Sequence, residues 1–209
     1  MNPPTIYLAS GSPRRREILT NLGYHVLRLP AEIDETPYPS ENATDYVQRM
    51  ARMKNSAALT TWQQNQQQPP EFPLISADTT VSLNNLILGK PASPDDAFRI
   101  LKLLSGRQHQ VHTAVCIYWH NHTSDVLQTS TVHFASLQDE QITAYIATGE
   151  PLDKAGAYGI QGLGGMLVEY ISGSFTGIMG LPVYETTQLL SQYGCTPLNQ
   201  SQSISSVPV

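Results

Sequence analysis

The sequence has very few cysteines and no long apolar run. Cys116 and Cys195 are the only two in 209 residues, lie far apart and have no metal-ligand spacing. A disulfide scaffold is therefore not expected, and reduced thiols are typical of the cytoplasm. The N-terminus lacks the basic and apolar regions of a signal peptide, and no segment approaches the length of a membrane span. We therefore expect a soluble cytoplasmic protein that does not contact membranes.

Positive charge is also scarce. Twelve Lys and Arg against 17 Asp and Glu give a net charge of −5, so no broad basic face is available for nucleic acid. The few cations are clustered, which suits a small anionic ligand. They include Arg14–Arg16, Arg49, Arg52, Lys54, Lys90 and Lys154. With 40% hydrophobic residues the chain can bury a core.

The apolar pattern predicts an α/β protein with a mixed, twisted sheet and flanking helices. Expected strands are 6–9, 24–30, 72–83, 86–91, 111–119, 126–135 and 166–171, and expected helices are 13–22, 43–62, 93–104, 139–148 and 182–194. A Gln-rich loop is expected at 63–70 and a hairpin connection at 120–125. We expect one domain over residues 1–195 and a disordered tail at 196–209.

Residues 6–16 read as strand, tight loop and helix. Ser12 is a good N-cap, and Pro13 suits the first helical position. Arg14, Arg15 and Arg16 fall in the first turn, where cations oppose the helix dipole unless an anion compensates. Backbone amides, the Ser10 and Ser12 hydroxyls and guanidinium groups would together form a phosphate site. The alternative is a surface helix that begins with basic residues.

Acidic residues supply the second candidate feature. Asp78 lies within an otherwise apolar strand, where a carboxylate needs a metal, a lysine or a bound water as partner. The alternative is a capping or edge-strand aspartate. Glu32, Asp34 and Glu35 offer oxygen ligands suited to Mg²⁺ or Mn²⁺, or form a solvated acidic loop.

Lysines and glycines complete the candidates. Gly and Pro flank Lys90, which fixes the direction of its ammonium group, while Lys54 and Lys154 are weaker candidates by spacing. Residues 154–165 are dense in glycine and allow close backbone approach to a ligand. Within them, Gln161 offers both donor and acceptor for a base edge. The histidines at 109, 112, 120 and 122 are interpreted as exposed strand and loop residues.

Several motifs together resemble one family, the Maf-type nucleotide pyrophosphatases. They are residues 10–15 (Ser-Gly-Ser-Pro-Arg-Arg), 32–35 (Glu-Ile-Asp-Glu), the helix with Arg49 and Lys54, 77–79 (Ala-Asp-Thr), 89–91 (Gly-Lys-Pro), 105–113, 153–162 and 180–182 (Gly-Leu-Pro), in this order over residues 5–194. Thr176 departs from the pattern, since many members carry Asn there.

The resemblance implies two lobes around a cleft, as in Maf and ITPase-like folds, and hydrolysis of a nucleoside triphosphate to monophosphate and pyrophosphate with a divalent metal. It implies that Asp78 is the catalytic base and that Arg14, Thr79 and Gln161 govern the choice of substrate. The motifs are similar to the branch acting on dTTP and UTP; the 7-methyl-GTP branch is the alternative.

In the resulting hypothesis, Ser10, Ser12, Arg14 and Arg15 hold the triphosphate, while Lys54 and Lys90 stabilise the transition state. Glu35 and Asp78 hold the metal ion or orient the water. A non-catalytic nucleotide-binding regulator of cell division and a phosphatase releasing orthophosphate are the rivals. The sequence leaves the oligomeric state open, with a homodimer as one alternative.

Overall fold

The computed structural model describes residues 3–30, 32–66 and 68–198. Its centre is a seven-stranded sheet in the order β2-β1-β3-β5-β6-β7, with β4 also paired to β3. The strands are β1 (Thr5–Leu8), β2 (His25–Arg28), β3 (Leu74–Leu83), β4 (Leu86–Leu88), β5 (Gln108–Trp119), β6 (His122–Phe134) and β7 (Val168–Ser172). β1 pairs in parallel with β2 and β3, and the other pairs are antiparallel. The predicted mixed α/β sheet is confirmed.

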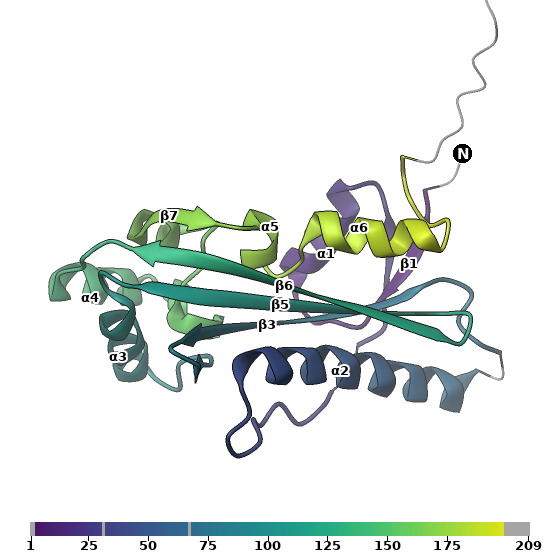
Figure 1. Ribbon diagram of the computed structural model, residues 1–209, viewed down its shortest axis with the longest axis horizontal. Coiled ribbons are helices and arrows are strands. Elements are labelled where there is room, and N and C mark those ends of the chain that lie inside the picture. The colour runs from purple at the N-terminus through teal and green to yellow at the C-terminus, as the bar shows by residue number, and fades with distance from the viewer. Residues whose placement is uncertain (1–2, 31, 67, 199–209) are drawn as a thin grey trace, which may run out of the picture.

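Helices cover both faces of the sheet (Figure 1). They are α1 (Pro13–Asn21), α2 (Ala43–Asn65), α3 (Pro94–Leu104), α4 (Asp139–Ala147), α5 (Phe175–Ile178) and α6 (Val183–Gln192), with 3-10 turns η1 (Glu150–Asp153), η2 (Ala155–Ala157) and η3 (Leu163–Leu167). Three helices begin at side-chain caps, which are Ser12 for α1, Asn42 for α2 and Ser93 for α3, and the cap at Ser12 was predicted. None of the helices among the described residues is long and apolar enough to cross a membrane.

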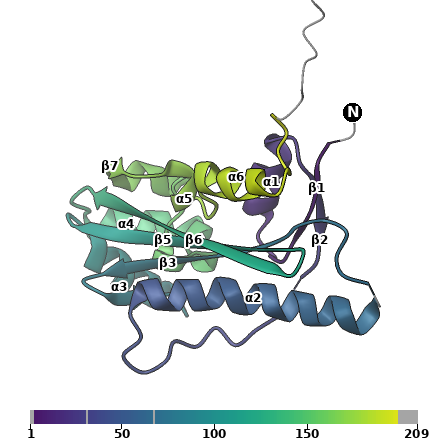
Figure 2. The same cartoon turned by 45° about the vertical axis from the view of Figure 1, so that its right-hand side comes forward.

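Alternation along β3 and β5 separates two of the cores. Ile75 and Ala77, with Val115 and Ile117 of β5, pack against α1 and α6. The residues between them face the other way, and Ala114 and Cys116 pack against Val47 and Ala51 of α2. Figure 2 shows α2 along one side of the long strands and α1 and α6 on the other. Adjacent residues of β3 therefore point toward different helices.

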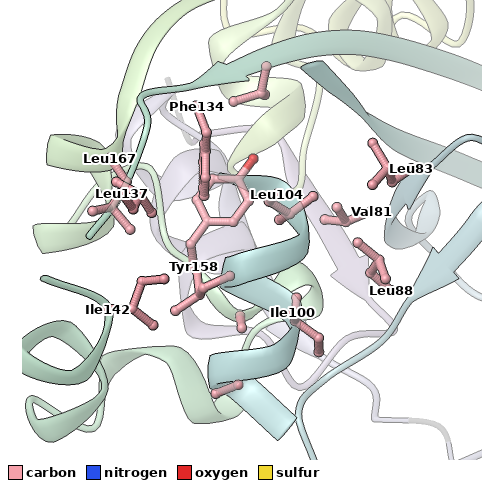
Figure 3. Packing of buried hydrophobic residues seen from close by; sticks show 14 of the residues in the cluster. Val81, Leu83, Leu88, Ile100, Leu104, Phe134, Leu137, Ile142, Tyr158 and Leu167 are labelled. Atoms are coloured by element: carbon pink, nitrogen blue, oxygen red, sulfur yellow. The ribbon is translucent and has the colours of Figure 1, made fainter. Parts of the chain in front are cut away.

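A third core closes the far end of the sheet, where α3 and α4 pack (Figure 3). Tyr158 comes from the glycine-rich segment and lies with its ring among the side chains of this core. Its ring makes an edge contact with Phe134, with the centroids 4.7 Å apart. The glycine-rich segment is thus tied into the core by one large aromatic side chain.

Three local predictions need correction. The helix α2 continues through residues 63–65, which we predicted as loop, because Gln is a good helix former and Trp62 packs on Tyr7. The β5–β6 connection is a two-residue turn at His120 and Asn121, both with positive φ, so residues 122–125 belong to β6. The short helix α5 was not predicted. Of the predicted tail, residues 199–209 lie outside the described part of the chain.

One interruption in the sheet positions the site. β1 pairs with β3 only at Leu74 and Ile75, and β4 pairs with β3 only from Val81 onward. Between these two pairings, the β3 segment containing Asp78 and Thr79 is paired on its β5 side alone, among the described residues. The gap lies at the carboxyl end of β1, where ligands commonly bind in open α/β sheets.

Candidate active site

A cavity of about 830 Å³ opens along this gap. All ten site residues predicted from the sequence line it: Ser10, Ser12, Arg14, Arg15, Glu35, Lys54, Asp78, Thr79, Lys90 and Gln161. They come from segments far apart in the chain, yet the fold brings them around one space. Glu32 and Asp34 are exposed and do not line this cavity, so only Glu35 of the acidic loop reaches it.

A lysine bridges the two carboxylates. Lys54, from the middle of α2, has its Nζ 2.6 Å from Asp78 Oδ1 and 2.7 Å from Glu35 Oε1. The prediction that the strand carboxylate needs a partner is met by this lysine. Asp78 faces α2 because it alternates with Ala77, which packs toward α1 and α6.

Burial and the charge of Lys54 act in opposite directions on the pKa values of the two carboxylates. Desolvation raises the pKa of Asp78 above its ordinary value, although the charges of Lys54 and Arg15 act in the opposite direction. Burial also opposes ionisation of Glu35, but the hydrogen bond and charge of Lys54 outweigh it, and its pKa is lowered. The environment therefore shifts the pKa values of the two carboxylates in opposite directions, and burial makes Asp78 more basic than an ordinary aspartate.

Arg15 is buried, and its guanidinium group bonds to the protein itself. Its Nε donates to the Gly180 carbonyl at 2.7 Å, Nη1 to Ser10 Oγ at 3.1 Å and Nη2 to Thr79 Oγ1 at 3.0 Å. Thr113 Oγ1 lies 2.9 Å from Thr79 Oγ1 and donates its proton to Gly177 O. Thr79 must then donate to Thr113, so its hydroxyl proton is already committed.

The loop before α1 has the geometry of an anion site. Ser12 Oγ caps the helix by accepting from the Arg15 amide, and the Ser12 amide itself donates to Ser10 Oγ. Arg14 is partly exposed beside this loop, 4.0 Å from Asp153 across the cavity. Arg16 is exposed and is not among the residues lining the cavity. A helix start with a partly exposed cation beside it favours phosphate binding.

Lys90 and Gln161 lie on the exposed rim. Neither side chain forms a hydrogen bond or ion pair with another described residue within the usual limits, so both are free to meet a ligand. The backbone next to Lys90 is fixed, because the Gly156 amide donates to the Gly89 carbonyl at 3.1 Å. Gly156 has φ +72, and a Cβ there would collide with Val81.

Sequence reasoning missed how Glu35 is held. Arg49 binds Glu41 through two hydrogen bonds of 2.6 Å, donates to the Thr36 carbonyl and stacks over the Tyr38 ring. Tyr46 donates to the Glu35 carbonyl at 2.8 Å. These contacts shape the acidic loop around α2. No local spacing indicated these contacts, because Arg49 and Lys54 are five residues apart in sequence and lie about 140° apart around the helix.

The interpretation of the histidines was half wrong. His109 and His112 are buried, and the His109 ring makes edge contacts with the rings of Phe134 and Tyr158. His109 Nε2 lies 2.8 Å from the Tyr158 hydroxyl, and His112 bonds to Ser82 and Thr129. His120 and His122 are exposed, as expected. Across the described ranges, no three His, Cys, Asp or Glu side chains are grouped to hold a metal ion.

Comparison with known proteins fits these observations. The family model for Maf-like proteins matches residues 5–193, and the chain belongs to this family. A dTTP/UTP pyrophosphatase of Neisseria gonorrhoeae is 54% identical over 193 residues, which cover 92% of this chain and 96% of that protein. A dTTP/UTP pyrophosphatase of Pasteurella multocida is 55% identical, covering 90% and 95%.

Two further matches are more general in name or in extent. A nucleoside triphosphate pyrophosphatase of Haemophilus ducreyi is 50% identical and covers 90% of this chain and 94% of its own. The solved structure of the Staphylococcus aureus Ham1 protein covers 63% of this chain and 72% of its own at 16% identity. Its TM-score of 0.45 is too low to bear on function.

Proposed function

We propose that this protein hydrolyses dTTP and UTP to the monophosphate and pyrophosphate. The observation that carries the proposal is the Asp78–Lys54–Glu35 group, which lies in the same cavity as the capped helix start at Ser12. A base of raised pKa beside an anion site is what water attack on a polyphosphate requires. The dTTP/UTP pyrophosphatases among the relatives support the choice of substrate.

The triphosphate would lie along the loop before α1. Donors there come from the hydroxyls of Ser10 and Ser12 and from amides at the helix start, and Arg14 supplies a partly exposed positive charge. Arg15 acts differently from our expectation for a phosphate ligand, because much of its donor capacity is used on Ser10, Thr79 and Gly180. Arg15 would shape the phosphate site and contribute positive charge to it without binding the phosphate directly.

Asp78 would remove the proton from the attacking water. Its raised pKa improves proton abstraction, and Lys54 keeps its carboxylate oriented toward the cavity. The water oxygen would bond to the α-phosphorus while the bond to the bridging oxygen breaks, so that pyrophosphate leaves. Lys54 and Lys90 would stabilise the negative charge that develops on the phosphoryl oxygens.

The carboxylate pair also fits a divalent cation. Mg²⁺ and Mn²⁺ favour hard oxygen ligands, and Mg²⁺ is commonly held by one or two carboxylates with phosphate and water completing its shell. Glu35 and Asp78, which share Lys54, match that donor set. Such an ion, when bound, would neutralise phosphate charge and polarise the phosphoryl group.

Gln161 is the best candidate for reading the pyrimidine. It lines the cavity, is exposed and carries both a donor and an acceptor. Thr79 has only acceptor capacity left, because its proton goes to Thr113. We therefore propose that Thr79 influences substrate choice by accepting from the base or through Arg15, and that Gln161 supplies the donor.

A product assay tests the proposal. Purified protein with Mg²⁺ should release pyrophosphate from UTP and dTTP faster than from 7-methyl-GTP or CTP. Orthophosphate as the first product would favour the phosphatase, and tight binding of triphosphates without turnover would favour the non-catalytic regulator. Preference for 7-methyl-GTP would move the chain to the other branch of the family.

We also propose that the reaction takes place in the cytoplasm, because neither Cys116 nor Cys195 forms a disulfide and free thiols are typical of that compartment.

A further inference from the structure

Glu150 is a carboxylate outside the cavity whose oxygens are occupied by the glycine-rich segment. Its Oε2 accepts from the Leu163 amide at 2.9 Å, and its Oε1 accepts from the Gly164 amide at 3.0 Å. The Tyr145 hydroxyl, from the last turns of α4, also donates to Oε1 at 2.9 Å. One carboxylate thus binds two successive backbone amides and one phenol, each with hydrogen-bond geometry.

The segment is shaped to admit this carboxylate. At Gly162 φ is −105°, which other residues can adopt, yet a Cβ there would collide with the Glu150 carboxylate. At Gly164 a Cβ would collide with the Tyr145 hydroxyl and with the Gly159 backbone. These glycines are therefore needed for close approach to the Tyr145–Glu150 pair.

The charge of Glu150 is stabilised where it stands. Burial opposes its ionisation, but the amides of Gly164 and Leu163, with Tyr145 and Lys154, outweigh that effect and lower its pKa. An ionised acceptor makes shorter and stronger hydrogen bonds to backbone amides than a neutral one. The Glu150 carboxylate is thus ionised at neutral pH, which is the form that makes the stronger hydrogen bonds.

The anchored residues flank Gln161 on both sides. The Gly159 amide donates to the Tyr145 hydroxyl at 3.2 Å, two residues before Gln161, and Glu150 holds residues 163 and 164 just after it. A glycine-rich backbone loses much entropy when it is ordered, so its conformation depends on such outside contacts. Without them Gln161 would sample many positions at the rim.

We propose that Glu150 is a positioning residue that sets pyrimidine selectivity by fixing the backbone that carries Gln161. This inference rests on the proposed function. It assigns Glu150 no contact with substrate: the carboxylate acts through Leu163, Gly164 and Tyr145. Its removal should therefore loosen recognition of the base and leave the chemistry at Asp78 in place.

Glu150→Gln tests this, with Glu140→Gln on the exposed face of α4 as matched control. A glutamine replaces one of the two carboxylate oxygens by an NH2 group, which cannot accept from the amide that faces it, so amide hydrogen exchange at residues 163 and 164 should become faster. The kcat/KM ratio of UTP over CTP should fall about tenfold, mainly through KM for UTP. Glu140→Gln should match the wild type. Tyr145→Phe, which keeps the carboxylate, should give a smaller change in the same direction.

Two results would overturn the inference. One is unchanged exchange at residues 163 and 164 in Glu150→Gln. The other is faster exchange with an unchanged UTP/CTP ratio, which would make Glu150 merely structural. If the wild type cleaves neither UTP nor dTTP, the proposed function fails instead. The exchange measurement, which needs no turnover, would still judge whether Glu150 anchors the segment.

Discussion

The floor of the cavity and the glycine-rich segment beside it are built in different ways. On the floor, the side chain of Lys54 from α2 bonds to Asp78 of β3, and that of Arg15 from α1 bonds to the neighbouring Thr79. The glycine-rich segment lines the cavity with residues between Lys154 and Gln161, and Gln161 is its exposed amide side chain. Its shape is set by Glu150, which lies outside the cavity, and by the bond between Tyr158 and the buried His109.

This difference separates chemistry from recognition. Buried, mutually bonded charges hold a reacting group in one geometry and shift its pKa, which suits the chemical step. A backbone segment held by a few external anchors can differ in shape while the floor stays unchanged. We therefore expect substitutions on the floor to abolish turnover and substitutions in or behind the segment to alter substrate choice.

The largest effect is expected for Asp78→Asn. The variant keeps the size of the side chain but cannot accept a proton, so kcat should fall about 10³-fold, within the range that general bases contribute. Pyrophosphate release from UTP measures it, and UTP binding by calorimetry should persist. The matched control is Asp125→Asn on β6, which breaks the ion pair with Arg52 of α2 and should stay active. An active Asp78→Asn enzyme would remove the base assignment.

Lys54→Met should cost roughly 10²-fold in kcat. The variant removes the charge that orients Asp78 and faces the developing phosphoryl charge. It also leaves two neighbouring carboxylates without their shared partner, so the acidic limb of the pH–rate profile should move to higher pH. Lys102→Met, at the exposed pair with Asp139, is the control. An unshifted acidic limb would mean that Lys54 does not tune Asp78.

Gln161→Ala should change selectivity more than turnover. Loss of the base-edge hydrogen bonds should lower kcat/KM for UTP and dTTP about tenfold while kcat at saturating UTP changes little. Gln188→Ala, at an exposed position of α6, serves as control. Equal losses for UTP, CTP and GTP would show that Gln161 does not read the base, and would weaken the division between floor and segment.

The smallest expected effect is on the pH dependence of the free energy of unfolding, through the buried His109. Burial, with a smaller contribution from His133, lowers the pKa of His109 from 6.5 to about 4. The unfolded chain binds this proton near pH 6.5 while the folded chain does not, so the stability contribution is present above that pH and is lost as pH falls toward 4.

Between about pH 7 and pH 5, the free energy of unfolding from urea titrations should therefore fall by about 2 kcal/mol less for His109→Gln than for the wild type. His120→Asn, at the exposed turn, should behave like the wild type. Equal pH dependence in wild type and His109→Gln would contradict the buried neutral state of His109.

The sequence predicted the floor better than the segment. A lone carboxylate in an apolar strand and a Ser-Pro helix start are local signals, and both Asp78 and Ser12 lie where they were expected. The partners of Arg15, at Gly180 and Thr79, depend on which strands become neighbours, which no local pattern encodes. The burial of His109 and the hydrogen bonds from the glycine-rich segment to Glu150 likewise depend on tertiary contacts.

The most direct test of the central claim is hydrolysis of UTP in water enriched in oxygen-18. If water held by Asp78 attacks the α-phosphorus, one labelled oxygen enters the uridine monophosphate and the released pyrophosphate stays unlabelled. Label in the pyrophosphate, or labelled orthophosphate as the first product, would contradict the placement of the α-phosphorus opposite Asp78.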